Sequence, residues 1–251
     1  MVSNTLKRQT PATEDKILSL ENIGLYYSRR QGILKRSRFW ALKDVSFDLY
    51  TGETLGVIGR NGVGKSTLLR VLAGIVAPDT GRVVVHRPGL RISLISIGAG
   101  FVGHLSGREN AILSGMMLGA KKEEILSRMD QIMAFADLGS FFDEPVNTYS
   151  TGMRARLGFS AAYYLDPDVI LLDEVLGVGD EAFRIKSTDA MKERIKSEKT
   201  VVLVSHTVPL IRELCDRLVW IEGGKTMAHG DVADVLDAYL SGAGQGRPPS
   251  K

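Results

Sequence analysis

The sequence has little cysteine and no long hydrophobic run, and both absences narrow its class. Cys215 is the single cysteine among 251 residues, which excludes an internal disulfide and fits a reducing cytoplasm. No stretch approaches the roughly 20 apolar residues that a membrane-spanning helix needs. The N-terminus lacks the apolar core of a signal peptide, and a net charge of +3 is too small to indicate a nucleic-acid partner. We therefore expect a soluble cytosolic protein that is not itself a channel and binds no nucleic acid.

The rest of the composition is ordinary for a globular protein, with 44% hydrophobic and 24% charged residues. The length suits one large α/β domain, or one domain with a subdomain. Residues 1–15 and 242–251 are polar and aperiodic, so we expect a disordered lead and a disordered tail. The folded domain should then span residues 16–241.

The most informative segment is GRNGVGKST at residues 59–67. It follows an apolar run and precedes a helix-forming run, and it fits the phosphate-loop pattern G-x-x-x-x-G-K-[ST]. Glycines let successive N–H groups turn toward one anion, and the helix that opens at Lys65 adds its positive dipole end. We expect Lys65 to reach the β- and γ-phosphates and Ser66 to bind Mg²⁺. The predicted ATP contacts here are Gly59, Arg60, Asn61, Gly62, Val63, Gly64, Lys65, Ser66 and Thr67.

The hydrophobic pattern predicts a parallel α/β core with an antiparallel β edge and an inserted helical subdomain at about residues 100–165. A β-hairpin is expected at 17–27 and 41–50. Further strands are expected at 82–86, 91–97, 169–172, 200–205, 218–221 and 225–228. Helices are expected at 108–119, 123–135, 152–164, 181–197, 208–215 and 232–240.

Polar residues end two of the buried strands, where ligands bind in parallel sheets. Asp173 would hold the Mg²⁺ shell, and Glu174 would orient or deprotonate the attacking water. His206 would donate to the γ-phosphate. The alternatives are that the acids merely begin a loop and that the histidine is structural. The phosphate loop upstream favours the catalytic interpretation, with Glu174, His206 and Lys65 as the catalytic residues.

A second possible anion site precedes the helix predicted at 152–164. The segment YSTGM at 149–153 places Ser150 and Gly152 at a helix start, where unpaired N–H groups gather. An ordinary capped helix is the alternative. A second phosphate-binding cap in one chain suggests contact with the triphosphate of another subunit.

These motifs, in this order, resemble an ABC transporter ATPase subunit over about residues 17–240. The loop at 177–180 belongs to the same pattern. The forms YSTGM, DEVLGVGD and AGF…LSGREN resemble the branch that exports O-antigen, capsule, teichoic acid and galactan. The resemblance implies a P-loop NTPase fold with a RecA-like core, at the cytoplasmic face of the inner membrane.

The resemblance also implies partners and cross-subunit roles. A homodimer would sandwich two ATP molecules between one copy's Lys65 loop and the other's Ser150 and Gly152. Tyr27 would stack on adenine, with the neighbouring Tyr26 in the core, and Asp180 would sense the opposite site. Two copies of a separate transmembrane permease would carry the lipid-linked polysaccharide, and polymer selection would lie mainly in that permease.

Two departures from the family pattern stand out. No glutamine follows the strand predicted at 91–97, and Ser96 is the residue that aligns with this Mg²⁺ ligand. In the YSTGM segment, which corresponds to the family's signature motif, Thr151 and Met153 replace the usual glycine and glutamine. This change would weaken nucleotide binding across the two subunits.

Residues 28–40 carry five cations and no acid. They form either a solvated loop or a surface facing the anionic membrane or a lipid-linked pyrophosphate headgroup.

Competing functions fit less well. An ABC transporter for another substrate is disfavoured by the YSTGM and GVGD forms. A non-transport ABC ATPase of DNA repair or translation would carry long coiled coils or a second cassette. A nucleotide kinase or GTPase would leave the signature segment unexplained.

Overall fold

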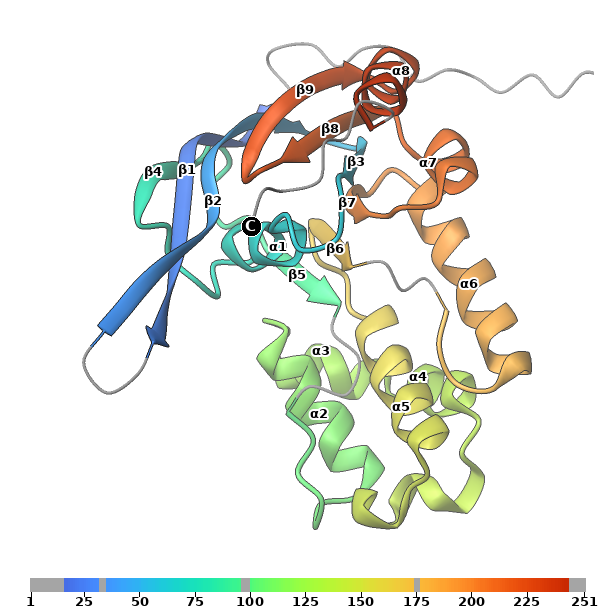
Figure 1. Ribbon diagram of the computed structural model, residues 1–251. Coiled ribbons are helices and arrows are strands. Elements are labelled where there is room, and N and C mark those ends of the chain that lie inside the picture. Colours follow the sequence, from blue (N-terminus) through green and yellow to red (C-terminus); the bar gives the residue numbers. More distant parts are fainter. Residues whose placement is uncertain (1–15, 32–34, 96–99, 174–176, 244–251) are drawn as a thin grey trace, which may run out of the picture. The chain divides into compact units, whose positions relative to one another are not determined.

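The computed structural model describes residues 16–31, 35–95, 100–173 and 177–243, shown in Figure 1. The chain divides into two compact units. The first contains residues 1–90 and 198–251, and the second contains residues 91–197. The expected helical segment, residues 100–165, is part of the second unit.

The first unit is built on a mixed sheet with strand order β4-β1-β2-β9-β8-β3-β7. Strand β3 pairs in parallel with β7 and β8, whereas β1 pairs antiparallel with β2 and β4. All five residues of β3 and of β7 are buried, as expected for parallel strands covered on both faces. The strands are β1 (Lys16–Gln31), β2 (Lys35–Tyr50), β3 (Thr54–Ile58), β4 (Thr80–Val85), β7 (Thr200–Val204), β8 (Arg217–Glu222) and β9 (Lys225–Asp231).

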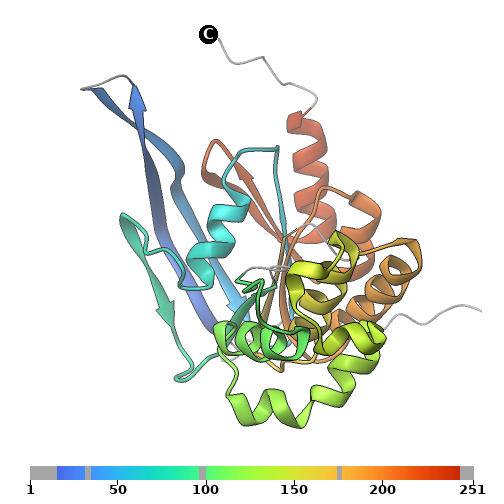
Figure 2. The same cartoon turned by 90° about the horizontal axis from the view of Figure 1, so that it is seen from below.

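The β1–β2 hairpin is longer than the sequence suggested. Strand pairing continues through the basic segment as far as Gln31 opposite Lys35. The expected strands, one ending at residue 27 and the other beginning at residue 41, were therefore too short. Strand β4 pairs with β1 only between Leu18 and Gly24. The hairpin therefore runs on past the end of β4 as a two-stranded arm, visible in Figures 1 and 2.

The described residues of the first unit also form three helices: α1 (Lys65–Leu72), α7 (Val208–Leu214) and α8 (Val232–Ala243). Helix α8 buries Val235 and Leu236 in a cluster with Ile58, Ile211 and Leu218. This cluster joins the end of β3 to α7 and β8, so apolar packing fixes the strand that leads into the phosphate loop.

Where the structure describes it, the second unit contains two parallel strands and a set of helices. Strands β5 (Ile92–Ile95) and β6 (Val169–Asp173) pair in parallel. The hydroxyl of Ser106 and the carboxylate of Glu109 form a capping box at the start of α2. The helices are α2 (Gly107–Met117), α3 (Lys122–Ser127), α4 (Met129–Ala136), α5 (Thr151–Tyr163) and α6 (Glu181–Lys196), with the 3₁₀ turns η2 (Gly139–Asp143) and η3 (Val146–Thr148).

The expectation of one continuous helix over residues 123–135 of this unit is wrong. Residues 123–135 form two helices, α3 and α4, that meet at Arg128. Its backbone turns to φ −109°, and its guanidinium donates to the carbonyl of Tyr164 at 3.0 Å. A tertiary hydrogen bond to the end of α5 therefore accompanies a break that helical periodicity alone did not reveal.

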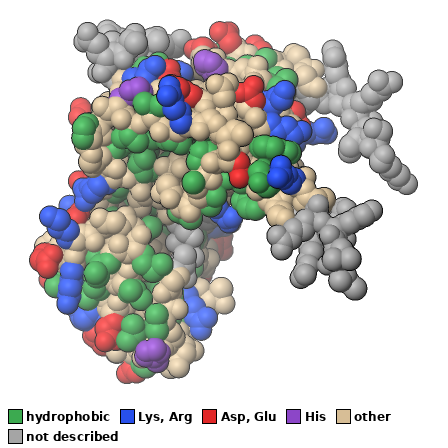
Figure 3. Space-filling model, turned by 90° about the vertical axis from the view of Figure 1, so that its left-hand side faces the viewer, with side chains coloured by type: hydrophobic (Ala, Val, Ile, Leu, Met, Phe, Trp, Pro, Cys, Tyr) green, Lys and Arg blue, Asp and Glu red, His purple; other side chains and the backbone are tan. Residues whose placement is uncertain are grey.

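The α/β fold with a mixed sheet and inserted helices confirms the predicted fold class. Among the described helices, none combines the length and apolarity needed to cross a membrane. Lys and Arg side chains are interspersed with Asp and Glu over the face shown in Figure 3.

The thiol of the half-buried Cys215 makes a pH-dependent prediction. Its sulfur lies where a Cβ on Gly56 would approach to 2.8 Å, and burial raises its pKa from 9.0 to about 12. Between these values the unfolded thiol loses its proton while the folded one keeps it, so the free energy of unfolding falls as pH rises. Between pH 7.5 and pH 10 the fall should be about 1 kcal/mol larger in the wild type than in Cys215→Ala, measured by urea denaturation. Equal losses in both proteins would contradict the burial of this thiol.

Candidate functional site

The loop between β3 and α1 has the backbone of an anion cradle. Gly59, Gly62 and Gly64 adopt φ values of +153°, +81° and +104°, a region that side chains rarely allow. Gly64 caps α1 in the left-handed conformation, and its carbonyl accepts from Leu68 N–H at 2.8 Å. The N–H groups of the first turn of α1 are therefore available to an anion in the loop.

Two of these glycines are fixed by neighbouring strands. A Cβ on Gly59 would lie 2.2 Å from the carbonyl oxygen of Ile221, and one on Gly64 would lie 2.4 Å from that of Ala41. A Cβ on Gly62 would meet nothing within 4 Å. The two ends of the loop are thus held against β8 and β2, while its middle faces open space.

Lys65 lies inside this cradle. Its side chain is buried, and its ammonium donates to the carbonyls of Gly59 at 2.8 Å and Arg60 at 3.0 Å. The other predicted contacts divide by exposure: Arg60, Asn61 and Ser66 are exposed, whereas Thr67 is buried. The Lys65 ammonium and the N–H groups of the loop can together bind the oxygens of a phosphate chain.

Tyr27 is the predicted adenine-stacking residue, and the structure brings it to the first turn of α1. Its hydroxyl lies 3.4 Å from the hydroxyl of Thr67, and its ring is 39% exposed. Tyr26 points to the other face of the strand, where its ring meets Trp40 edge-on at 5.1 Å between centroids. The half-exposed Tyr27 ring is therefore the one available beside the phosphate loop.

His206 and the phosphate loop follow strands that end at the same edge of the sheet. Val57 of β3 pairs with Val204 of β7. Gly59 comes two residues after Val57, and His206 comes two residues after Val204. The carboxyl ends of parallel strands meet at one edge. His206 is exposed there, which brings the predicted γ-phosphate donor to the loop's side of the sheet.

The second unit carries the signature segment. Ser150 is the N-cap of α5, and its hydroxyl accepts from Met153 N–H at 3.2 Å. Ser150 is exposed and Gly152 is half-buried. The capped helix start is therefore present; its contact with a second subunit's nucleotide stays a prediction.

Asp173 and Asp180 lie at ends of elements in the second unit. Asp173 is the half-buried last residue of β6. Asp180 caps α6 by accepting from Phe183 N–H at 3.1 Å, and it pairs with the guanidinium of Arg156. The hydrogen bonds from Arg156 hold the pKa of the Asp180 carboxyl below its usual range, so this carboxylate is charged at neutral pH.

Arg156 is a residue that the sequence interpretation missed. Its guanidinium, 19% exposed, also lies 3.5 Å from the carboxylate of Asp137 at the end of α4 and 5.1 Å from the ring centre of Phe183. One side chain thus joins α4, α5 and α6. No local pattern pairs residue 156 with residue 180, because only the fold brings them together.

Glu174 and Ser96 lie outside the described residues. Tyr27, the phosphate loop and His206 belong to the first unit, whereas Ser150, Gly152, Asp173 and Asp180 belong to the second. A cavity of about 440 Å³ also opens beside the first turn of α5, where Thr151 and Arg154 lie opposite Phe101 and Asn147.

Comparison with known proteins supplies the family. The sequence profile of the ABC transporter family matches residues 42–177. An O-antigen export system ATP-binding protein, RfbB of Klebsiella pneumoniae, is 38% identical over 220 residues, which cover 88% of this chain and 89% of the relative. The chain belongs to the ABC transporter family.

Other ABC relatives are longer than this chain. The teichoic acids export ATP-binding protein TagH of Enterococcus faecalis is 44% identical over 201 residues, which cover 80% of this chain and 44% of the relative. TagH of Listeria monocytogenes is 41% identical over 216 residues, which cover 86% of this chain and 63% of the relative. The chain thus spans about half the length of several curated relatives that it matches.

Solved ABC structures share the fold. A dimeric ATP-binding cassette with bound ADP and Pi matches with a TM-score of 0.67 at 22% identity, covering 86% of this chain and 99% of that one. An ATP-binding subunit of an ABC transporter matches with a TM-score of 0.69 at 22% identity, covering 89% and 93%.

The predicted Mg²⁺ donors that the structure describes, Ser66 in the first unit and Asp173 in the second, each offer an oxygen atom. No group of three or more His, Cys, Asp or Glu side chains within the described ranges could hold a metal ion. The Ser66 hydroxyl is exposed at the first turn of α1, and Asp173 supplies a carboxylate at a strand end. Mg²⁺ prefers such oxygen ligands and usually completes its shell with phosphate oxygens and water.

The middle of the loop and its end at β2 predict unequal costs for alanine. Gly62→Ala should lower the free energy of unfolding by about 1–2 kcal/mol for the left-handed backbone. Gly64→Ala should lower it by roughly 1–3 kcal/mol more, because its Cβ would also displace the Ala41 carbonyl. Urea denaturation of the two variants measures the difference, and equal losses would show that β2 does not hold the loop.

Proposed function

We propose that this chain is the ATP-binding and ATP-hydrolysing subunit of an ABC exporter. It would power the movement of a lipid-linked polysaccharide across the cytoplasmic membrane. The similarity to the Klebsiella O-antigen export protein along nearly the whole of both chains is the observation that carries this proposal. The polymer could be O-antigen, galactan or a teichoic-acid-like chain.

The geometry of the first unit supports a nucleoside triphosphate as the ligand. The loop offers N–H groups, a buried ammonium and a helix dipole to a chain of phosphates. Tyr27 offers an aromatic face beside the same helix turn. Because the ring and the cradle flank one helix start, ATP would bind with its base on Tyr27 and its phosphates in the loop.

The chain's own residues would divide the work of hydrolysis. Lys65 would exchange its bonds to the Gly59 and Arg60 carbonyls for phosphate oxygens. Glu174 would orient and deprotonate water, and His206 would donate to the γ-phosphate. Ser66 and Asp173, with Ser96 as the third oxygen donor, would hold Mg²⁺, which neutralises phosphate charge when bound.

Two copies would complete each site. Ser150 and Gly152 of one copy would face the nucleotide in the other copy's loop, because the capped start of α5 presents N–H groups. Asp180 would sense the opposite site. Arg156 of α5 would hold the loop at residues 177–180 in place against this helix, because its guanidinium binds the Asp180 carboxylate.

Closure of this dimer on ATP would move two copies of a separate transmembrane permease. The subunit would then sit peripherally at the cytoplasmic face of the inner membrane. It would contact the lipid-linked polysaccharide through the permease and would bind no nucleic acid.

Separate variants test binding and turnover. Glu174→Gln should abolish ATP hydrolysis yet accumulate an ATP-bound dimer, because the cradle is intact and the water is no longer activated. Lys65→Ala should show neither turnover nor an ATP-dependent dimer, because the cradle loses the buried ammonium that would bind the phosphates. Phosphate release and light scattering report the two steps. Full hydrolysis by Glu174→Gln would remove that residue from its role.

The hairpin arm makes a second functional prediction. Arg29, Arg30, Lys35, Arg36 and Arg38 lie on paired strands near its tip, and each cation near an anionic membrane contributes on the order of 1 kcal/mol. Changing all five to Ser should lower export and weaken binding to anionic vesicles at least tenfold, by roughly that estimate, while basal ATP hydrolysis is unchanged. A control variant with Lys121 and Lys122 changed to Ser should retain export. Unchanged export by the five-fold variant would defeat the role.

A further inference from the structure

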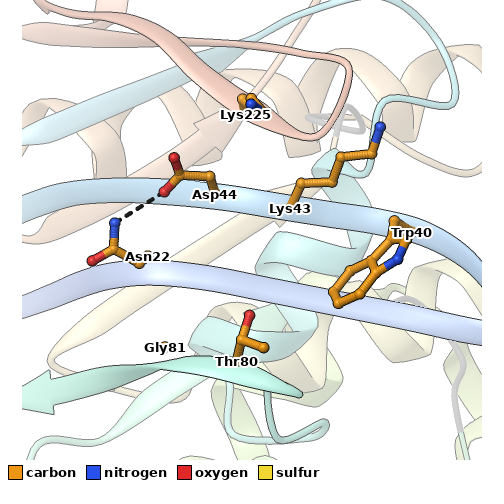
Figure 4. Close-up of a pocket in the computed structure, with 7 residues that line it drawn as sticks. All are labelled: Asn22, Trp40, Lys43, Asp44, Thr80, Gly81 and Lys225. Atoms are coloured by element: carbon orange, nitrogen blue, oxygen red, sulfur yellow. Dashed lines mark hydrogen bonds between the residues drawn. The ribbon is translucent and has the colours of Figure 1, made fainter.

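A cavity of about 650 Å³ lies in the first unit among β1, β2, β4 and the start of β9, shown in Figure 4. Strand β2 contributes Trp40, Lys43 and Asp44 to its lining, and β1 contributes Asn22. The remaining lining residues are Thr80, Gly81 and Lys225. The volume falls within the range of about 300–1,000 Å³ that small-molecule sites occupy.

This cavity is separate from the phosphate loop. In the hairpin, Tyr26 pairs with Trp40 and Tyr27 pairs with Phe39. Adjacent residues of a strand point to opposite faces, and the Tyr27 hydroxyl faces Thr67 of α1. Trp40 and Tyr26 therefore lie on the face of the hairpin turned away from that helix, so ATP in the phosphate loop would leave the cavity open.

Gly24 and a bulge at Asn22 shape the part of β1 beside the cavity. A Cβ on Gly24 would lie 2.3 Å from the Thr80 hydroxyl and 3.1 Å from the Trp40 ring. The bare backbone thus lets the indole lie across β1 toward Thr80, as Figure 4 shows. Asn22 has φ +52° at a register shift in β1, and its amide donates to the Asp44 carboxylate at 3.0 Å. Bulges of this kind re-aim side chains beside functional sites.

The charges around the cavity favour an anion. Lys43 and Lys225 are exposed, and within the described ranges neither ammonium has an ion-pair partner. The single carboxylate of the lining, Asp44, accepts from Asn22. Arg38 lies 4.7 Å over the Tyr26 ring, which adds a further cation on the Trp40 face.

The polar and aromatic groups favour a sugar attached to that anion. An indole offers an apolar face for the C–H face of a pyranose ring. Asn22, Asp44 and Thr80 offer amide, carboxylate and hydroxyl groups to the ring's hydroxyls, and the two lysines would bind a phosphate. We propose that this cavity is a binding site for a sugar phosphate.

Two sources could supply this chemistry: a free sugar phosphate, or the sugar phosphate end of the lipid-linked glycan. The second source rests on the proposed export function, whereas the first does not. The Lys43 and Lys225 side chains take no part in the ATP site, so failure of the cavity would leave the ATPase proposal standing. Loss of ATP hydrolysis would likewise leave binding by the free ligand measurable.

The test uses the full chain labelled with 5-fluorotryptophan, which gives ¹⁹F signals for Trp40 and Trp220. Glucose 1-phosphate should shift the Trp40 signal saturably and leave the Trp220 signal in place, with or without a non-hydrolysable ATP analogue. Glucose and inorganic phosphate alone should bind at least roughly tenfold more weakly, because each lacks half of the contacts.

Surface variants separate binding from folding. Lys43→Gln combined with Lys225→Gln should weaken glucose 1-phosphate binding roughly tenfold or more without changing ATP hydrolysis. Lys121→Gln, which removes an exposed lysine outside the cavity, should bind as the wild type does. The proposal would be overturned if the Trp40 signal shifted neither with millimolar glucose 1-phosphate nor with liposomes that carry polyprenyl glucosyl phosphate. Competition by the ATP analogue, or equal affinity in the double variant, would also overturn it.

The source is decided by a second pair of titrations. One uses glucose 1-phosphate in solution, and the other uses liposomes that carry polyprenyl glucosyl phosphate. A Trp40 shift with both ligands supports a site for free and lipid-linked forms alike, and a shift with liposomes alone assigns the site to the lipid-linked form. A shift with plain liposomes would show a lipid contact and would contradict sugar recognition.

Discussion

The first unit depends on a close fit of glycine backbone against two carbonyl groups. Gly59 lies against Ile221 of β8 and Gly64 against Ala41 of β2, each at a distance that admits no Cβ. The phosphate loop is therefore clamped at both ends by strands distant in the chain. The buried Lys65 ammonium binds the carbonyls of the same loop. This clamp makes the cradle a rigid feature of the sheet and ties it directly to the hairpin strand β2.

An analogous constraint organises the second unit. The Arg156 guanidinium contacts Asp180, Asp137 and the ring of Phe183, and stacked and edge-on rings of Phe135, Phe159 and Phe183 surround the same junction. The signature helix α5 is thereby fixed to both neighbouring helices. Charge-assisted bonds to a guanidinium are directional, so a rotation of α5 would carry the Asp180 loop with it.

The two faces of the β1–β2 hairpin serve different surroundings because strand side chains alternate. Tyr27 faces the helix that follows the phosphate loop, while Trp40 lines the cavity among the outer strands and Tyr26 packs edge-on against it. One hairpin thus joins the nucleotide side of the unit to an aromatic and basic surface. The same strands continue as a basic arm, so these features lie on one pair of strands.

The sequence by itself determined the fold class and the phosphate loop, because hydrophobic periodicity and glycine spacing are local properties of the chain. It also determined the Ser150 cap and the strand that ends at Asp173, although their roles stay predictions. Tertiary structure decided the length of the hairpin, the break at Arg128, the Arg156–Asp180 pair and the Trp40 cavity. Each of these arises where side chains or strands far apart in the chain meet, and such contacts leave no signal in local spacing.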